Sequence, residues 1–240
     1  MSDHISFLIE KLPALLFGFS GQRPGGLFLS LILAVLAVAV GFCLAVPVSS
    51  AERSKLRPLR WCAVAYVEFF RGIPLILLLV LIHQGVGGVR FGLNWSPRTS
   101  ALVALALYSS AYQAEILRAG LAAVPQELVE SARLMGSRPR QVYILVKLRY
   151  ALRVMLPAFT GQAISLFKDT SVVVVIGVAE VMTVARMALG ADVTNAPYWV
   201  TMYSFVGVLY FALAFTLSRL SQRWERRSRP SDLAHSFFSY

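Results

Sequence analysis

The sequence predicts an all-α integral membrane protein with five transmembrane helices. Of its 240 residues, 57% are hydrophobic and only 15% are charged, a balance that excludes an ordinary soluble domain or a disordered chain. A helix of about 20 apolar residues crosses a bilayer. Stretches of roughly this length occupy residues 27–49, 61–86, 99–121, 154–179 and 198–220. The loops between them alternate between strongly basic and weakly basic, as expected of a multi-pass membrane protein.

The basic residues also predict the orientation. Most of the 23 Lys and Arg residues lie between the first and second stretches, between the third and fourth, and after the fifth. Cytoplasmic loops carry the excess of Lys and Arg, so we expect the N-terminus outside and the C-terminus in the cytoplasm. Topology and anionic membrane lipid then explain the net charge of +11, without a nucleic-acid partner.

The chain is expected to form one membrane domain with short flanking segments. Residues 1–26 would form an external segment with a short interfacial helix, since this apolar region is interrupted by charge and proline. No cleavable signal peptide is expected. Residues 27–220 would form the membrane domain, with a cytoplasmic loop at 122–153, and residues 221–240 a cytoplasmic tail. Both cysteines fall within membrane stretches and are expected to be packing residues, with no disulfide or metal site.

The second stretch contains a helix breaker and a possible charge pair. Pro74 removes a backbone donor and predicts a kink near Gly72. Glu68 and Arg71 are three residues apart and could pair on one helix face. His83 is expected to be a hydrogen-bonded packing residue, because the sequence offers it no nucleophile.

The third stretch begins apolar and then turns polar from Tyr108 to Glu115, a segment that includes Ser109 and Gln113. Polar residues inside a membrane helix face a bundle interior or a water-filled cavity. Two interpretations remain open: this face lines a path, or it makes ordinary hydrogen bonds between helices.

The fourth stretch holds two adjacent charges, Lys168 and Asp169. Each charge at the centre of a lipid-facing helix would cost about 2.5–3.5 kcal/mol. Gln162 lies two helical turns before Asp169 on the same face. We therefore expect this face to line an interior cavity rather than lipid.

The cytoplasmic loop is expected to hold two helices separated by a glycine turn. Pro125 and the acidic residues after it suit a first helical turn, and Leu128, Ala132 and Met135 would form an apolar stripe. Gly136 suits the position that ends this helix. Ser137 would cap the second helix, with Pro139 in its first turn. Acidic residues fit poorly against an anionic leaflet, so a protein partner is favoured.

The sequence contains no phosphate-binding G-x-x-x-x-G-K-[ST] loop. We expect no catalytic activity from this chain and no cofactor bound by it. Five spans are few for a complete path, so an oligomer with the path between protomers is expected.

Four segments together carry a resemblance to a known family: "YVEFFRGIPLILLL", "AYQAEILRAGLAAVPQ", "ELVESARLMG" and "LFKDTS". In this order they resemble the permease subunits of ATP-binding-cassette (ABC) importers. The subgroup that they resemble takes up polar amino acids and includes histidine, glutamine and glutamate–aspartate permeases.

The resemblance implies a type I ABC importer permease fold in the cell inner membrane. Such subunits form dimers, either of one chain or of two similar chains. Two cytoplasmic ATPase subunits, which bind ATP and Mg²⁺, dock onto them, and an extracytoplasmic binding protein delivers the amino acid. The residues that match the ATPase-coupling motif of the family are Glu130, Ser131, Ala132 and Gly136.

The resemblance also implies a substrate site in the membrane. Gln162 occupies a substrate-contacting position, Asp169 would pair with the substrate ammonium, and Lys168 would pair with a carboxylate. Gln113 and Ser109 are assigned to the same path. Because a neutral Gln stands where cationic amino acid transporters often carry an acid, we expect glutamate or aspartate, then glutamine or another polar amino acid.

Three alternatives stay open from the sequence. Gln162 and Asp169 could instead form a structural network with Gln113. The chain could be an ion-coupled secondary carrier with Lys168, Asp169 and His83 as a relay, or a scaffold without transport. Glu180 and Arg186 are expected near the outer end, as interface or binding-protein contacts.

The sequence departs from the family pattern at two positions. Arg149 stands where the family often has proline, so the helix there is expected to bend only near Pro157. Gly161 replaces a common Asn and would loosen the start of the fourth stretch.

Overall fold

The computed structural model describes residues 2–21, 24–88 and 93–227, and its regular elements in these ranges are helices. In chain order they are α1 (Ser2–Phe17), α2 (Gly26–Glu52), α3 (Arg57–Gly72), α4 (Leu75–Val80), the π-helix η1 (Leu81–Val86), α5 (Pro97–Ala122), α6 (Gln126–Leu134), α7 (Pro139–Gln141), the π-helix η3 (Val142–Leu148), α8 (Arg149–Asp169), the 3₁₀-helix η4 (Thr170–Ile176), α9 (Val181–Gly190), the 3₁₀-helix η5 (Val193–Tyr198) and α10 (Trp199–Arg227). The all-α class expected from the sequence is confirmed.

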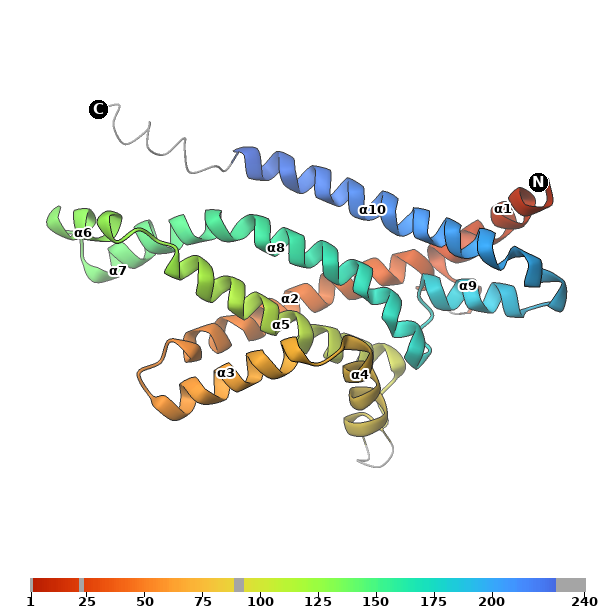
Figure 1. Cartoon of the computed structure of the whole chain (residues 1–240), viewed down its shortest axis with the longest axis horizontal. Coiled ribbons are helices and arrows are strands. Elements are labelled where there is room, and N and C mark those ends of the chain that lie inside the picture. The colour runs from red at the N-terminus through yellow and green to blue at the C-terminus, as the bar shows by residue number, and fades with distance from the viewer. Residues whose placement is uncertain (1, 22–23, 89–92, 228–240) are drawn as a thin grey trace.

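Four long helices, α2, α5, α8 and α10, run roughly along the long axis of the molecule (Figure 1). Helices α6 and α7 lie at one end of this axis, and α1 and α9 lie at the other. The most basic loops of the sequence belong to the α6 end. The arrangement therefore separates two polar ends by a predominantly apolar middle.

Not every expected span passes a test of length and apolar content. Helix α2 and the segment Val193–Trp224 are long and apolar enough to cross a membrane. Helices α3 and α4–η1 make a third candidate only if the bent pair counts as one span. Helices α5 and α8, with 26 and 21 residues, have the length but are more polar. The five-span count therefore stays a prediction.

The second stretch is broken rather than kinked. Helix α3 ends at Gly72, α4 starts at Leu75, and the chain bends by 106° between α3 and the segment Leu75–Val86. Pro74 has no backbone N–H to continue the ladder of α3. An interruption near Gly72 was expected and is confirmed, although as a break and not as the expected kink. Beyond it α4 takes a new direction (Figure 1) and buries Leu78 and Leu79 in the core.

The fourth stretch is also not one continuous α-helix. Helix α8 ends at Asp169, and the chain continues as a 3₁₀-helix until Gly177, which has φ +74°. The segment Thr170–Ile176 is rich in β-branched residues, which lose side-chain freedom in an α-helix. At the start of α8, by contrast, Arg149 has ordinary helical torsions of −63° and −42°. The helix is therefore continuous at Arg149, the position where the family often has proline.

Helices α2 and α5 make the most extensive contact of the bundle, along a row of small residues. An added Cβ at Gly41 would lie only 3.1 Å from the backbone oxygen of Ala106 and 3.1 Å from the Cβ of Ser109. Small residues let membrane helices approach in this way. Cys43 and Cys62 were expected to be packing residues, but both are exposed on the chain and do not pack inside it.

Candidate functional site

A row of polar and aromatic side chains connects three helices in the middle of the molecule. The guanidinium of Arg71, at the end of α3, lies 5.5 Å from the ring centre of Tyr112 on α5. The hydroxyl of Tyr108 donates a hydrogen bond of 3.3 Å to that of Tyr112, and their ring centres are 4.9 Å apart. Asp169, at the end of α8, lies within electrostatic range of Tyr108 but makes no hydrogen bond or ion pair with it. The row thus has a cation at one end and a carboxylate at the other.

Chain breaks position both charged ends of this row. Arg71 precedes the break at Gly72, and Asp169 is the last residue of α8 before the 3₁₀ segment. Irregular backbone at membrane depth occurs where it is buried in protein or lines a cavity. Both charges therefore lie at the kind of position that discontinuous helices provide for polar ligands.

The expected path residues on α8 are Gln162, Lys168 and Asp169, and their polar groups are available to bind a ligand. Lys168 is exposed, whereas Gln162 and Asp169 are partly buried. Within the described part of the chain, none of the three side chains has a hydrogen-bond or ion-pair partner. The alternative in which Gln162 and Asp169 bond to Gln113 is therefore not what the structure contains.

Gln113 and Ser109 lie elsewhere, in the contact between α2 and α5. The Gln113 Nε2 donates to the Val38 carbonyl oxygen at 3.1 Å and to the Ser109 hydroxyl at 2.7 Å. Both residues are fully buried, and the Gln113 Oε1 has no hydrogen-bond partner among the described residues. Their visible role is to hold two helices together.

The remaining charges of the second stretch are not paired as expected. The ion pairs among the described residues join Glu10 to Lys11 and Glu115 to Arg118, so Glu68 does not bind Arg71. Nδ1 of His83 lies 3.0 Å from the Ser100 hydroxyl, as expected for a packing residue. No group of three or more His, Cys, Asp or Glu side chains that could hold a metal occurs in the described ranges.

Glu180 was expected at an exposed outer contact, and this was wrong. Its side chain is completely buried. The carboxylate accepts hydrogen bonds from the backbone N–H groups of Met182 and Thr183, both at 2.9 Å, and from the Tyr210 hydroxyl at 3.1 Å. It caps α9 and ties it to α10. The sequence could have indicated the cap, because an acid precedes a helical run, but not the burial.

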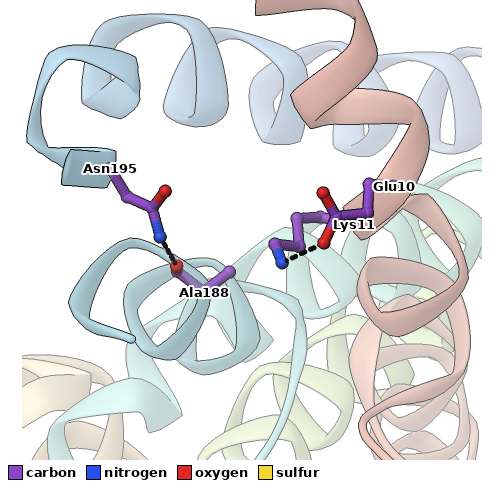
Figure 2. A network of polar contacts seen from close by, with 4 residues as sticks. All are labelled: Glu10, Lys11, Ala188 and Asn195. Carbon is purple, nitrogen blue, oxygen red and sulfur yellow. Dashed lines mark hydrogen bonds and ion pairs between the residues drawn. The ribbon is translucent and has the colours of Figure 1, made fainter. Parts of the chain in front are cut away.

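The end of the molecule opposite α6 is built from α1, α9 and η5. Figure 2 shows Asn195 of η5 donating to the Ala188 carbonyl oxygen of α9, at 3.1 Å, beside the Glu10–Lys11 ion pair of α1. At the start of η5, hydrogen bonds from the Thr194 backbone and hydroxyl lower the pKa of the Asp192 carboxyl. The hydrogen bond from Asn195 to Ala188 joins η5 to α9.

Helix α6 ends in the turn that its glycine predicted. Gly136 has φ +79°. The N–H of Ser137 donates to the Ala132 carbonyl at 3.1 Å, and that of Gly136 to the Arg133 carbonyl at 2.9 Å. This pair of bonds defines a Schellman motif. The next helix starts with Pro139, as expected, but Arg138 rather than Ser137 occupies the N-cap position.

The four coupling residues face in two directions. Glu130, Ser131 and Gly136 are exposed, whereas Ala132 is buried against Val142 of η3. The expected stripe was also misplaced, because the packed residues of α6 are Val129 and Ala132. Leu134 and Met135 are instead 89% and 80% exposed. Two large apolar side chains are thus exposed beside the coupling residues. Sequence reasoning placed Met135 in the packed stripe and did not identify Leu134.

The chain matches a family model along most of its length. Residues 37–229 match the family described as "Binding-protein-dependent transport system inner membrane component". The chain belongs to this family. It is a multi-pass inner membrane component, and its resemblance to ABC importer permeases is confirmed.

Curated relatives of this inner membrane component cover most of the chain. It is 32% identical to the glutamate/aspartate import permease protein GltK of Escherichia coli O6:H1, over 93% of this chain and 97% of the relative. It is 34% identical to the L-cystine transport system permease protein TcyB of Bacillus subtilis, over 91% and 96%. It is 33% identical to the amino-acid ABC transporter permease protein YhdY of E. coli K12, over 89% of this chain but 58% of that relative. The chain thus spans little more than half of YhdY.

Solved structures show the same fold. The crystal structure of an amino acid ABC transporter with histidines matches with a TM-score of 0.82 at 31% identity, covering 94% of this chain and 98% of that one. The MetNI methionine ABC transporter, in an inward-facing conformation, matches with a TM-score of 0.68 at 22% identity, covering 95% and 99%.

Proposed function

We propose that this component is the membrane-spanning subunit of an ABC importer that carries a polar amino acid across the inner membrane, with glutamate or aspartate as the preferred substrate. The observation that carries the proposal is the row of contacts from Arg71 through Tyr112 to Tyr108, with the carboxylate of Asp169 within electrostatic range of Tyr108. An amino acid presents a carboxylate and an ammonium group, and the two ends of the row complement them.

The charges of the region favour an acidic substrate. Arg71 and Lys168 are cations, and Asp169 is the anion that interacts with Lys168 and with Tyr108. Glutamate and aspartate carry two carboxylates and one ammonium group, which is the complementary set. Gln162 of α8 is partly buried, and its amide can donate a hydrogen bond to a carboxylate without repelling it.

The energy for transport would come from partner subunits. The exposed surface of α6, with Glu130, Ser131, Leu134 and Met135, is the proposed docking site for an ATPase subunit that holds ATP and Mg²⁺. The opposite end, around η5, is proposed to meet an extracytoplasmic binding protein.

A second permease subunit, identical or similar, would complete the path against α8. A ligand moves such a system only by binding its states with different affinities.

The proposal is tested by reconstituting the importer, with its ATPase and binding protein, in proteoliposomes. Asp169→Asn is expected to lower glutamate uptake about tenfold or more, because a charge-assisted contact is worth about 1.5–3 kcal/mol. Arg71→Gln should do the same, whereas Arg71→Lys should retain part of the activity.

The control is Lys55→Gln, which removes an exposed charge of the loop between α2 and α3. It should leave uptake unchanged. Uptake at the parental rate by Asp169→Asn, in a complex that still hydrolyses ATP, would contradict the assigned site. Preferred uptake of a cationic amino acid would contradict the substrate class.

A further inference from the structure

A groove between α8 and α10 lies outside the translocation and coupling sites. It has a volume of about 300 Å³ and is lined by Leu156 and Thr160 of α8 and by Leu220, Ser221 and Trp224 of α10. This volume is within the range of ligand-binding pockets, about 300–1,000 Å³. The surface of the groove consists mainly of carbon atoms of leucine and tryptophan side chains. The groove therefore suits an apolar ligand such as a hydrocarbon chain.

Arginines flank one end of this groove. Arg153 precedes Leu156 by three residues on α8, and Arg223 follows Leu220 by three residues on α10. Residues three apart share a helix face. The two helices run antiparallel (Figure 1), so both shifts lead toward the α6 end of the molecule. The two guanidinium groups therefore belong to the same end of the groove.

These arginines are not neutralised within the described part of the chain. Its ion pairs involve other residues. Arg223 is exposed and Arg153 is half-buried. Trp224, whose side chain is 71% exposed, adds an amphipathic ring of the type that collects at membrane–water interfaces.

We propose that this groove binds one anionic phospholipid. An acyl chain would lie between α8 and α10, and the headgroup phosphate would contact Arg153 and Arg223. Basic pockets between membrane helices recognise anionic headgroups, and Arg matches phosphate geometry better than Lys. The charge pattern favours a phospholipid over a second copy of the chain. A second copy would bring further arginines to the end of the groove that is already positively charged.

The test uses Trp224 as the reporter in the full-length chain. The other tryptophans, Trp61, Trp95 and Trp199, are replaced by Phe, and the protein is placed in phosphatidylcholine nanodiscs. A small fraction of the lipid is either dibrominated phosphatidylglycerol or dibrominated phosphatidylcholine, because bromine quenches nearby indole fluorescence. We expect the brominated phosphatidylglycerol to be enriched at Trp224 over the brominated phosphatidylcholine.

Charge variants separate a site from general attraction to the membrane surface. Arg153→Gln and Arg223→Gln should each lower the enrichment about fivefold. This factor corresponds to the free energy with which one basic residue is attracted to an anionic membrane surface. The double variant Arg153→Lys with Arg223→Lys keeps both positive charges, so it should retain most of the enrichment. It also shows that substitution at these positions preserves the fold. Arg57→Gln with Arg60→Gln, two exposed arginines at the start of α3, should leave it unchanged.

Two results would overturn the proposal. Equal quenching by the two brominated lipids would mean that the groove has no preference for an anion. Quenching by neither would mean that protein covers the groove, such as a second copy of the chain.

Discussion

Glu180 lies where α2, α9 and α10 meet, and its carboxylate serves several donors at once. Replacing it by Ala removes the cap of α9 and leaves the partly buried Tyr210 hydroxyl without this acceptor. Unsatisfied buried donors cost about 1–3 kcal/mol each. We therefore expect Glu180→Ala to lower the thermal unfolding midpoint of the purified chain by several degrees. Glu180→Gln, which keeps one acceptor oxygen, should lower it less.

Asp192 provides the matched control for Glu180. It also caps a helical turn, through the Thr194 N–H at 2.8 Å, but it is exposed. Asp192→Ala should leave the unfolding midpoint nearly unchanged. An equal shift in both variants would show that burial of Glu180 contributes nothing.

Gly136 holds a conformation that only glycine adopts without strain. Nothing lies within 4 Å of an added Cβ, so the cost of Gly136→Ala is purely conformational, about 1–2 kcal/mol. Gly136→Asn should cost less, because Asn tolerates this region. Gly161→Ala, at an equally open position within α8, should instead stabilise slightly. Thermal unfolding of the three variants in detergent checks this order, and a destabilised Gly161→Ala would contradict it.

At the level of single residues, the sequence distinguished polar from apolar positions, but it did not show which partner each polar residue faces. Tyr108, Ser109, Tyr112 and Gln113 all appear on one polar segment of α5. The structure directs the two tyrosines toward Arg71 and Asp169, and Ser109 and Gln113 toward α2. The rotation of α5 is set by the close approach of α2 at Gly41, which no local pattern reveals.

The exposed end of α6 is the element best suited to bind a partner. Leu134 and Met135 expose most of their side chains, and burying such a side chain in an interface contributes about 1.5–3 kcal/mol. We expect Leu134→Ser with Met135→Ser to weaken association with the ATPase about tenfold or more, measured by co-purification and by uptake-coupled ATP hydrolysis. Val193→Ser, at a position 91% exposed on the opposite end, should leave association intact. Full co-purification of the double variant would exclude these side chains from the interface.

At the level of elements, local chemistry predicted the interruptions better than the continuous helices. Pro74, Gly136 and Pro139 marked their breaks correctly, because each acts through its own backbone. The π-helices η1 and η3 were not predicted, and neither was the 3₁₀ segment η4. Their backbone geometry depends on contacts with other helices, such as Val142 of η3 packing on Ala132. Such contacts are absent from the local sequence.

The whole molecule has two chemically different ends, and its orientation in the membrane is still a prediction. The basic loops place the α6 end in the cytoplasm and the α1–α9 end outside. In a variant with Cys43 and Cys62 replaced by Ala, single cysteines at Gln126 and Ala196 would report on the two ends, since both positions are exposed. An impermeant maleimide should label Ala196→Cys in intact spheroplasts, and Gln126→Cys only after permeabilisation. The two positions lie one membrane crossing apart if the stretch that contains α8 crosses as expected, because α10 begins only after Ala196. Labelling of both cysteines in intact spheroplasts would therefore contradict the crossing expected between them, and the reverse pattern would contradict the positive-inside orientation.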